Sequence, residues 1–143
     1  MPETRRMIGV VVVDDNELLC QSIERWMTDA TGVRCLASTG KVGEARKFVA
    51  DLRPDVLLLD AEIPGEDTFA LIRWVAGAHP STKVLMLSGY LAEAYVSNAL
   101  ALGASGYVLK DESLPTIIES IKSAAKGELV LSKSVKPLLL GPA

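Results

Sequence analysis

The sequence has few residues of the kinds that form cross-links or bind soft metals. Its 143 residues include two cysteines, Cys20 and Cys35, and one histidine, His79. The cysteines lie among apolar neighbours without the spacing of a metal site, so we expect both to be small, reduced core residues. His79 has no partner for a metal site or a catalytic dyad, which predicts a solvated loop residue. Zinc binding, a disulfide framework and histidine catalysis by this chain are therefore not expected.

Long apolar runs and an excess of basic charge are also missing. No apolar run approaches the roughly 18 residues that span a bilayer. The apolar stretch that follows MPETRR is short and ends in acids, which argues against a signal peptide. The formal net charge of -3 argues against nucleic-acid binding by this chain alone, because phosphate backbones favour basic surfaces. We therefore expect a cytoplasmic protein that is not bound to a membrane.

What the chain does contain is an alternation of apolar strands and amphipathic helices. Leu19, Ile23 and Trp26 have the spacing of one helix face, for example. Strands that are apolar on both faces and separated by helices imply a parallel sheet covered on both sides. The predicted fold is a doubly wound α/β domain with five parallel strands. Strands are expected at 8–15, 33–38, 55–60, 83–89 and 106–111, and helices at 17–27, 42–52, 67–78, 92–104 and 113–127.

Chemically active side chains follow four of the five strands. Because doubly wound folds bind their ligands beyond the carboxyl ends of the strands, we expect these side chains to meet at one edge. They are Asp14 and Asp15 after the first strand, Asp60 after the third, Ser88 after the fourth and Lys110 after the fifth.

Three close carboxylates repel one another unless positive charge offsets them. Lys110 supplies one such charge, and the remainder predicts a hard divalent cation with oxygen ligands, most naturally Mg²⁺. A metal and a lysine together suit a phosphoryl group, and a carboxylate there can act as the nucleophile that forms an acyl phosphate. Each piece alone is common, since acids often cap helices and a Ser-Gly pair is often a turn. All of them on one edge indicate phosphoryl transfer.

The segments VVVDDN, VLLLDAEIPGED, VLMLSGY and GASGYVLKD carry a resemblance to a known family. Together they resemble the receiver domain of bacterial response regulators in two-component signalling, from about Ile8 to about Gly127. The resemblance implies a flavodoxin-like sheet with strand order 2-1-3-4-5 and a receiver domain over residues 1–127. It also implies a phosphoryl group received from a sensor histidine kinase in a Mg²⁺-dependent reaction. Such a chain is a signalling phospho-acceptor and not an enzyme in the ordinary sense.

The resemblance assigns roles around the metal and the phosphoryl group. Asp60 resembles the phospho-acceptor. Asp15 and Asp60 resemble the direct Mg²⁺ ligands, Asp14 holds a metal-bound water, and the backbone carbonyl of Glu62 completes the protein's share. Lys110 resembles the lysine that contacts a phosphoryl oxygen.

Two further residues resemble the switch of this family. Ser88 would hydrogen-bond the phosphoryl group, and Tyr107 would turn inward when Ser88 moves; the structural alternative for Tyr107 is a half-buried strand tyrosine. Glu62 and Tyr90 occupy the two variable positions that flank the phosphoryl group, and we expect this pair to slow self-dephosphorylation. Thr68 stands where many relatives have glycine, which predicts a less permissive loop.

The region LALGASGYVLKDESLPTIIESIKSAAKGELVLSKSV resembles the subfamily with LuxR-type helix-turn-helix output domains. Residues 128–143 would then be a linker or C-terminal helix that leads to an output domain not in this chain, and DNA would be bound only through that domain. A homodimer that forms on phosphorylation is among the expected assemblies. The alternatives are a phosphorylation-independent interaction module of the same fold and an aspartate-nucleophile phosphatase, which would need an Asp where Glu62 stands.

Overall fold

The computed structural model describes residues 7–29, 32–89 and 91–140. In this part of the chain, six strands form one parallel sheet in the order β2-β1-β3-β4-β5-β6. Five of them confirm the predicted fold and strand order. The short β6, at the edge beside β5, was not predicted, because two residues are too few to show a period. The strands are β1 (Ile8–Val13), β2 (Val33–Thr39), β3 (Val56–Asp60), β4 (Lys83–Ser88), β5 (Gly106–Leu109) and β6 (Val130–Leu131).

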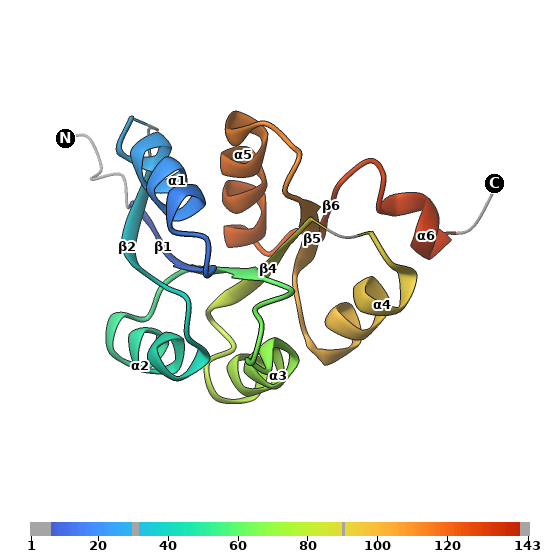
Figure 1. Ribbon diagram of the computed structural model, residues 1–143, viewed down its shortest axis with the longest axis horizontal. Coiled ribbons are helices and arrows are strands. Elements are labelled where there is room, and N and C mark those ends of the chain that lie inside the picture. Colours follow the sequence, from blue (N-terminus) through green and yellow to red (C-terminus); the bar gives the residue numbers. More distant parts are fainter. Residues whose placement is uncertain (1–6, 30–31, 90, 141–143) are drawn as a thin grey trace.

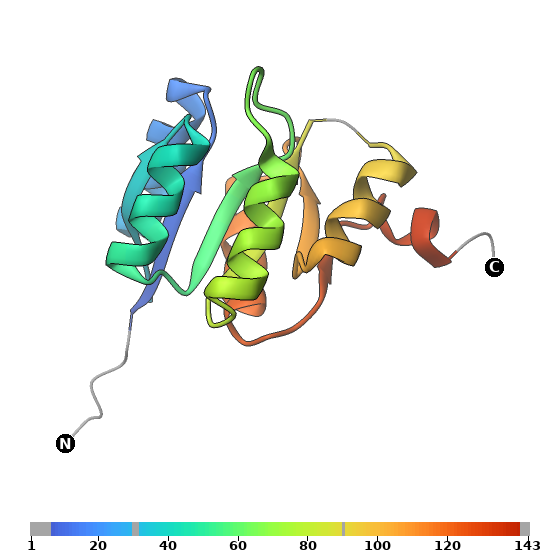
Figure 2. The same ribbon diagram turned by 90° about the horizontal axis from the view of Figure 1, so that it is seen from below.

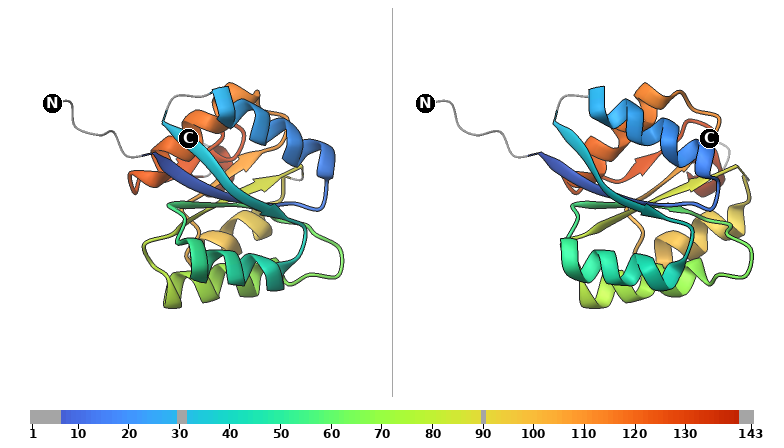
Figure 3. Two further views of the ribbon diagram at one scale, coloured as in Figure 1. Left: turned by 90° about the vertical axis from the view of Figure 1, so that its left-hand side faces the viewer. Right: turned by 60° about the vertical axis from the view of Figure 1, so that its left-hand side comes forward.

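Helices cover both faces of the sheet (Figures 1 and 3). α1 (Glu17–Asp29) and α5 (Leu114–Ala125) lie on one face. α2 (Val42–Leu52), α3 (Thr68–Ala78) and α4 (Glu93–Leu102) lie side by side on the other, and the short α6 (Lys136–Leu140) lies against α4 (Figure 2). No helix in the described ranges combines the length and apolarity needed to cross a bilayer.

The core has two apolar layers, one on each face of the sheet. Alternate residues of the central strands supply the two layers, since successive side chains of a strand point to opposite faces. Val11 and Leu59 pack towards α2 and α3, whereas Val12 and Leu58 pack towards α1 and α5. The central strands are therefore apolar on both faces, as the continuous apolar runs of the sequence predict, and they hold the strand ends rigidly at one edge.

Three local predictions need correction. Trp26 lies on the outer side of α1 and is 42% exposed, because the helix turns Cys20, Ile23 and Met27 inward instead. Both cysteines are free, as predicted, and Cys20 is buried. Cys35 is only partly buried, because it lies on the edge strand β2. His79 is half-buried at the end of α3, with its ring centroid 4.9 Å from that of Trp74, and is not a purely solvated residue.

Candidate phosphoryl-acceptor site

The three predicted carboxylates do meet at the carboxyl edge of the sheet. β1 and β3 are hydrogen-bonded neighbours, with Val13 opposite Leu59, so the acids that end them are brought together. One carboxylate oxygen from each of Asp14, Asp15 and Asp60 lies within 4.8 Å of the others. Asp14 and Asp60 are 3% and 4% exposed, and Asp15 is exposed. The cluster therefore has two buried carboxylates and one that is exposed to solvent.

Lys110 reaches this cluster from the loop after β5. Its Nζ lies 2.8 Å from Oδ2 of Asp14 and 3.1 Å from Oδ2 of Asp60, to which it donates a hydrogen bond. The lysine stem passes over Gly89, where an added Cβ would lie 4.0 Å from Cδ of Lys110. Burial lowers the pKa of Lys110, but the contact with Asp14 and the charge of Asp60 outweigh it and leave that pKa raised. The ammonium is therefore firmly charged.

The turn after β3 fixes the position of the Asp60 carboxylate. The backbone N–H of Glu62 donates to Oδ1 of Asp60 at 3.0 Å, and the Thr68 hydroxyl donates to the carbonyl of Ala61 at 2.8 Å. Burial raises the pKa of Asp60, and the charge of Asp14 adds to the effect, whereas the Glu62 N–H and Lys110 act in the opposite direction. Glu62 itself is exposed, and the role predicted for its carbonyl stays a prediction.

Ser88 and Tyr107 lie on the next two strands of the sheet after β3. Ser88 ends β4 and Tyr107 lies within β5, and both are fully buried. Burial raises the pKa of the Tyr107 hydroxyl, and a side-chain hydrogen bond with Ser88 partly offsets this. Tyr107 is fully buried and not half-buried, because α4 and the C-terminal segment close over this face of β5, and its role as a switch stays a prediction. Tyr90, the second residue expected to tune dephosphorylation, lies outside the described residues.

The acidic cluster fits a hard divalent cation. Oδ2 of Asp14 is buried and lies 2.8 Å from Nζ of Lys110, which also contacts Asp60. One ammonium thus faces a cluster of three carboxylates, and the negative charge that it leaves uncompensated is costly unless a further cation offsets it. The three acids offer only oxygen ligands, which Mg²⁺ and Ca²⁺ prefer. The donor set and the excess negative charge thus both match an Mg²⁺ site.

Two loop contacts near the site were not foreseen. The Glu66 carboxylate accepts a hydrogen bond from the backbone N–H of Val42 at 2.5 Å, so the loop after β3 caps the start of α2. The sequence predicts a less permissive loop at Thr68 but not the hydrogen bond from the Thr68 hydroxyl to the Ala61 carbonyl. An acid such as Glu66 in the loop after a strand is a candidate helix cap. The sequence does not show which helix it caps, because its partner Val42 is 24 residues away.

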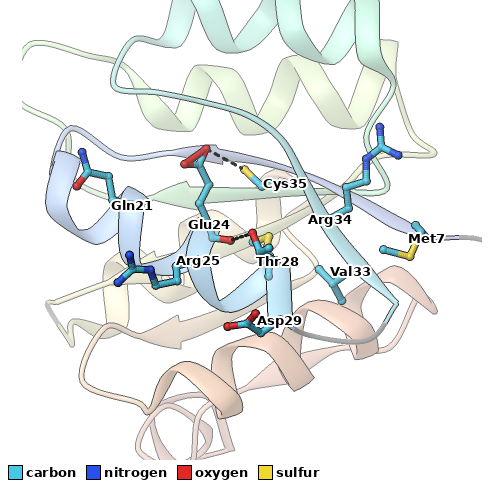
Figure 4. A pocket seen from close by; sticks show the side chains of 10 residues that line it. Met7, Gln21, Glu24, Arg25, Thr28, Asp29, Val33, Arg34 and Cys35 are labelled. Carbon is cyan, nitrogen blue, oxygen red and sulfur yellow. Dashed lines mark hydrogen bonds between the residues drawn. The ribbon is translucent and has the colours of Figure 1, made fainter.

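A hollow in the surface lies away from these residues (Figure 4). It measures about 780 Å³ and lies between α1 and the start of β2, near the amino ends of the strands. Its charged lining residues have both signs, with Glu24 and Asp29 beside Arg25 and Arg34. The hollow thus lacks the combination of clustered carboxylates and a contacting lysine that the carboxyl edge has.

Fold and site together define a class, a doubly wound α/β domain with an acid-and-lysine site for phosphoryl groups. The family model described as "Response regulator receiver domain" matches residues 10–122. The chain belongs to this family.

Named relatives agree with the family. The transcriptional regulatory protein DegU of Brevibacillus brevis is 34% identical over 121 residues, which are 84% of this chain and 51% of that protein. The response regulator GacA of Pseudomonas viridiflava is 29% identical over 129 residues, 90% of this chain and 60% of that protein. The chain thus spans between half and two thirds of the length of these curated relatives.

Solved structures give the same result. The signal receiver domain of the putative response regulator NarL from Mycobacterium tuberculosis has a TM-score of 0.81 at 30% identity, covering 86% of this chain and 99% of that one. A two-component response regulator of the LuxR family from Aurantimonas has a TM-score of 0.87 at 21% identity, covering 94% of this chain and 96% of that one, and this likeness concerns the fold.

Proposed function

We propose that Asp60 accepts a phosphoryl group from the phosphohistidine of a sensor histidine kinase. A carboxylate oxygen of Asp60 would form the new bond to phosphorus while the bond from phosphorus to the histidine nitrogen breaks. The observation that carries this proposal is the position of Lys110, whose Nζ lies 2.8 Å from Asp14 and 3.1 Å from Asp60. From there the same ammonium can turn to an oxygen of the incoming group.

The other residues would position the group and offset its charge. Asp15 and Asp60, with the carbonyl of Glu62, would hold Mg²⁺ directly, and Asp14 would hold a water on it. The ion would neutralise the charge that develops on the phosphoryl oxygens. Ser88 would donate its hydroxyl to one of these oxygens, which changes its contact with Tyr107. The signal would be a shift in population between two arrangements of β4, β5 and α4.

The relatives support a proposal for the wider function. We propose that residues 1–127 form the receiver and that residues 128–143 are a linker towards a LuxR-type DNA-binding domain outside this chain. Support comes from the relatives described as transcriptional regulators, among them the DNA-binding transcriptional activator DevR/DosR of Mycobacterium tuberculosis. The chain would act in the cytoplasm. Phosphorylation would favour a homodimer, and the output domains of the dimer would bind DNA.

The test of phosphoryl acceptance is direct. The chain is incubated with Mg²⁺ and phosphoramidate, and intact mass is measured for the wild type, Asp60→Asn and Asp51→Asn. Asp51 is an exposed acid on α2 and serves as the matched control. We expect one added phosphoryl group in the wild type and in Asp51→Asn, and none in Asp60→Asn. No gain in any folded variant would favour the phosphorylation-independent interaction module.

Self-dephosphorylation should be slow because of Glu62 and Tyr90. Glu62 is exposed and would add negative charge near the phosphoryl group, and the family position of Tyr90 would let an aromatic side chain hinder the attacking water. Glu62→Asn combined with Tyr90→Ala should shorten the lifetime of the phosphorylated chain. The decay is followed by intact mass after the donor is removed, and an unchanged lifetime would contradict this assignment.

A further inference from the structure

The segment 128–140 lies beyond the part of the chain that the family model matches, yet it folds back onto β5. β6 pairs with β5 in parallel, with Leu131 opposite Tyr107, and α6 lies against α4 (Figure 1). Val135 is fully buried and belongs to the same apolar cluster as Tyr107. This segment is therefore packed against the switch residue and is not a free tail.

Gly106 permits the close approach of β6. A Cβ added at Gly106 would lie 2.3 Å from the carbonyl oxygen of Val130 and 3.0 Å from its Cβ. Real Cβ atoms do not come this near to a backbone oxygen, so any other residue at 106 would displace β6 or β5. The glycine that begins β5 thus makes room for this neighbour.

Ser132 makes the two hydrogen bonds that continue the pairing past the end of β6. Its backbone N–H donates to the carbonyl of Tyr107 at 3.2 Å, and its hydroxyl accepts from the backbone N–H of Leu109 at 3.0 Å. The side chain thereby takes the place of the carbonyl that a longer strand would offer. Ser132 is 6% exposed, so both bonds are shielded from water.

These bonds fix the backbone of β5 just before Lys110. On one side of β5, the Lys110 N–H donates to the carbonyl of Ser88 at 2.8 Å, and on the other side Ser132 holds Leu109. The chain that precedes the lysine stem is thus fixed from both sides. We propose that Ser132 is a positioning residue for the phosphoryl site, which holds the end of β5 so that Lys110 reaches Asp60. This inference rests on the proposed phosphoryl-acceptor function.

The coupling must act in both directions. If docking of Ser132 favours the placement of Lys110 on a phosphoryl group, then phosphorylation favours docking of the segment by the same factor. The C-terminal segment would then report the state of Asp60 to whatever follows it. The route is short, since Leu109 and Lys110 are adjacent in the chain.

The experiment compares Ser132→Ala, Ser132→Thr and Ser134→Ala in the 143-residue chain. Ser134 is an exposed serine of the same segment and is the matched control, and threonine keeps a hydroxyl at 132. Three quantities are measured: the rate of mass gain with phosphoramidate at saturating Mg²⁺, the affinity for Mg²⁺, and the exchange rate of the Leu109 amide hydrogen.

We expect Ser132→Ala to slow phosphorylation by about fivefold, which is the effect of one neutral hydrogen bond, and to speed exchange at Leu109. Its affinity for Mg²⁺ should be that of the wild type, because the acids that would hold the ion are on β1 and β3. Ser132→Thr should recover the rate, and Ser134→Ala should behave as the wild type.

Several results would overturn the inference. A wild-type rate in Ser132→Ala, or an equal slowing in Ser134→Ala, would show that the hydroxyl does not position Lys110. A parallel loss of Mg²⁺ affinity would show that the substitution disturbs the whole acidic edge and not the lysine. If the wild type itself gained no phosphoryl group, the proposed function would be wrong. If the wild type and Ser132→Ala were phosphorylated equally fast, only the inference about Ser132 would be wrong.

Discussion

Among single residues, Lys110 does most to offset the negative charge of the acidic edge. Its side chain is 25% exposed and contacts two acids that are almost fully buried. Removing one partner of a buried ion pair leaves the other charge uncompensated, which costs more than the pair itself contributes. The sequence pattern could reveal this lysine because its position at a strand end is local information.

Replacing Lys110 should therefore reduce stability as well as phosphorylation. We expect Lys110→Met to lower the free energy of unfolding by about 1–3 kcal/mol in a chelator, and added Mg²⁺ should restore part of it. The matched control is Lys122→Met, because Lys122 pairs with Glu119 at 3.3 Å on the surface of α5. Such a surface pair is worth at most about 1 kcal/mol. Urea unfolding with and without Mg²⁺ measures both, and equal losses would contradict the role given to Lys110.

Cys35 shows a second residue-scale effect, away from the site (Figure 4). Burial raises the pKa of its thiol to about 12, and the Glu24 carboxylate adds to this, with its Oε1 3.8 Å from the sulfur. A higher pKa leaves less thiolate at a given pH, and the thiolate is the reactive form. We expect alkylation of Cys35 by iodoacetamide at about pH 8 to be roughly a hundredfold or more slower than that of a free cysteine, and to speed up as pH rises.

The contribution of Glu24 can be separated from that of burial. Glu24→Gln removes the charge and should raise the alkylation rate of Cys35, whereas Glu17→Gln, an exposed acid at the start of the same helix, should not. Peptide mapping distinguishes Cys35 from Cys20, whose pKa burial raises to about 11. A rate that Glu24→Gln leaves unchanged would show that burial alone protects the thiol.

At the scale of elements, the loop between β3 and α3 connects Asp60 to its surroundings. Thr68, the first residue of α3, is buried and its hydroxyl donates to the Ala61 carbonyl of the loop, while the Glu66 carboxylate of the loop caps α2. The loop is thus tied to α3 by one hydrogen bond and to α2 by another. Thr68 thus supplies a hydrogen bond that a glycine at this position could not make.

The Thr68 bond can be removed without a change in shape. Thr68→Val leaves the Ala61 carbonyl without this donor, and we expect a loss of about 1–2 kcal/mol in the free energy of unfolding, with slower phosphorylation of Asp60. The matched control is Thr28→Val, because Thr28 is exposed and its hydroxyl bonds only within α1, to Glu24. Urea unfolding and the rate of mass gain with phosphoramidate are the measurements. Similar losses in both variants would argue against a role for the loop bond.

At the scale of the whole molecule, the features that sequence predicts are those with local signals. Five strands, their order and the meeting of Asp14, Asp15, Asp60 and Lys110 follow from apolar periods, strand ends and family resemblance. The rotation of α1, which exposes Trp26, is set by packing between distant segments and has no local signal. The same holds for β6 and for Ser132, whose acceptor and donor lie on β5, more than twenty residues earlier. Contacts of this kind need the folded chain.

The acidic edge also implies a conflict between function and stability. Burial and the nearby Asp14 raise the pKa of Asp60, so the folded chain holds a proton there more tightly than the unfolded chain does. At neutral pH, well above the ordinary carboxyl pKa of about 4, the ionised Asp60 therefore costs folding free energy. The stability that a protonated Asp60 gives is present at low pH and is lost as the pH rises.

Asp60→Asn keeps the shape of the side chain and removes this charge. In a chelator at neutral pH we expect the variant to be more stable than the wild type in urea, and the difference should shrink as the pH falls towards the carboxyl pKa. Mg²⁺ should then stabilise the wild type more than the variant, because a ligand stabilises the state that binds it by mass action. Asp51→Asn, at an exposed position of α2, should change stability by no more than about 0.5 kcal/mol under either condition. If the variant were less stable than the wild type without metal, the attraction of Lys110 would outweigh the cost of burying the ionised Asp60. The conflict between function and stability inferred for the acidic edge would then be wrong.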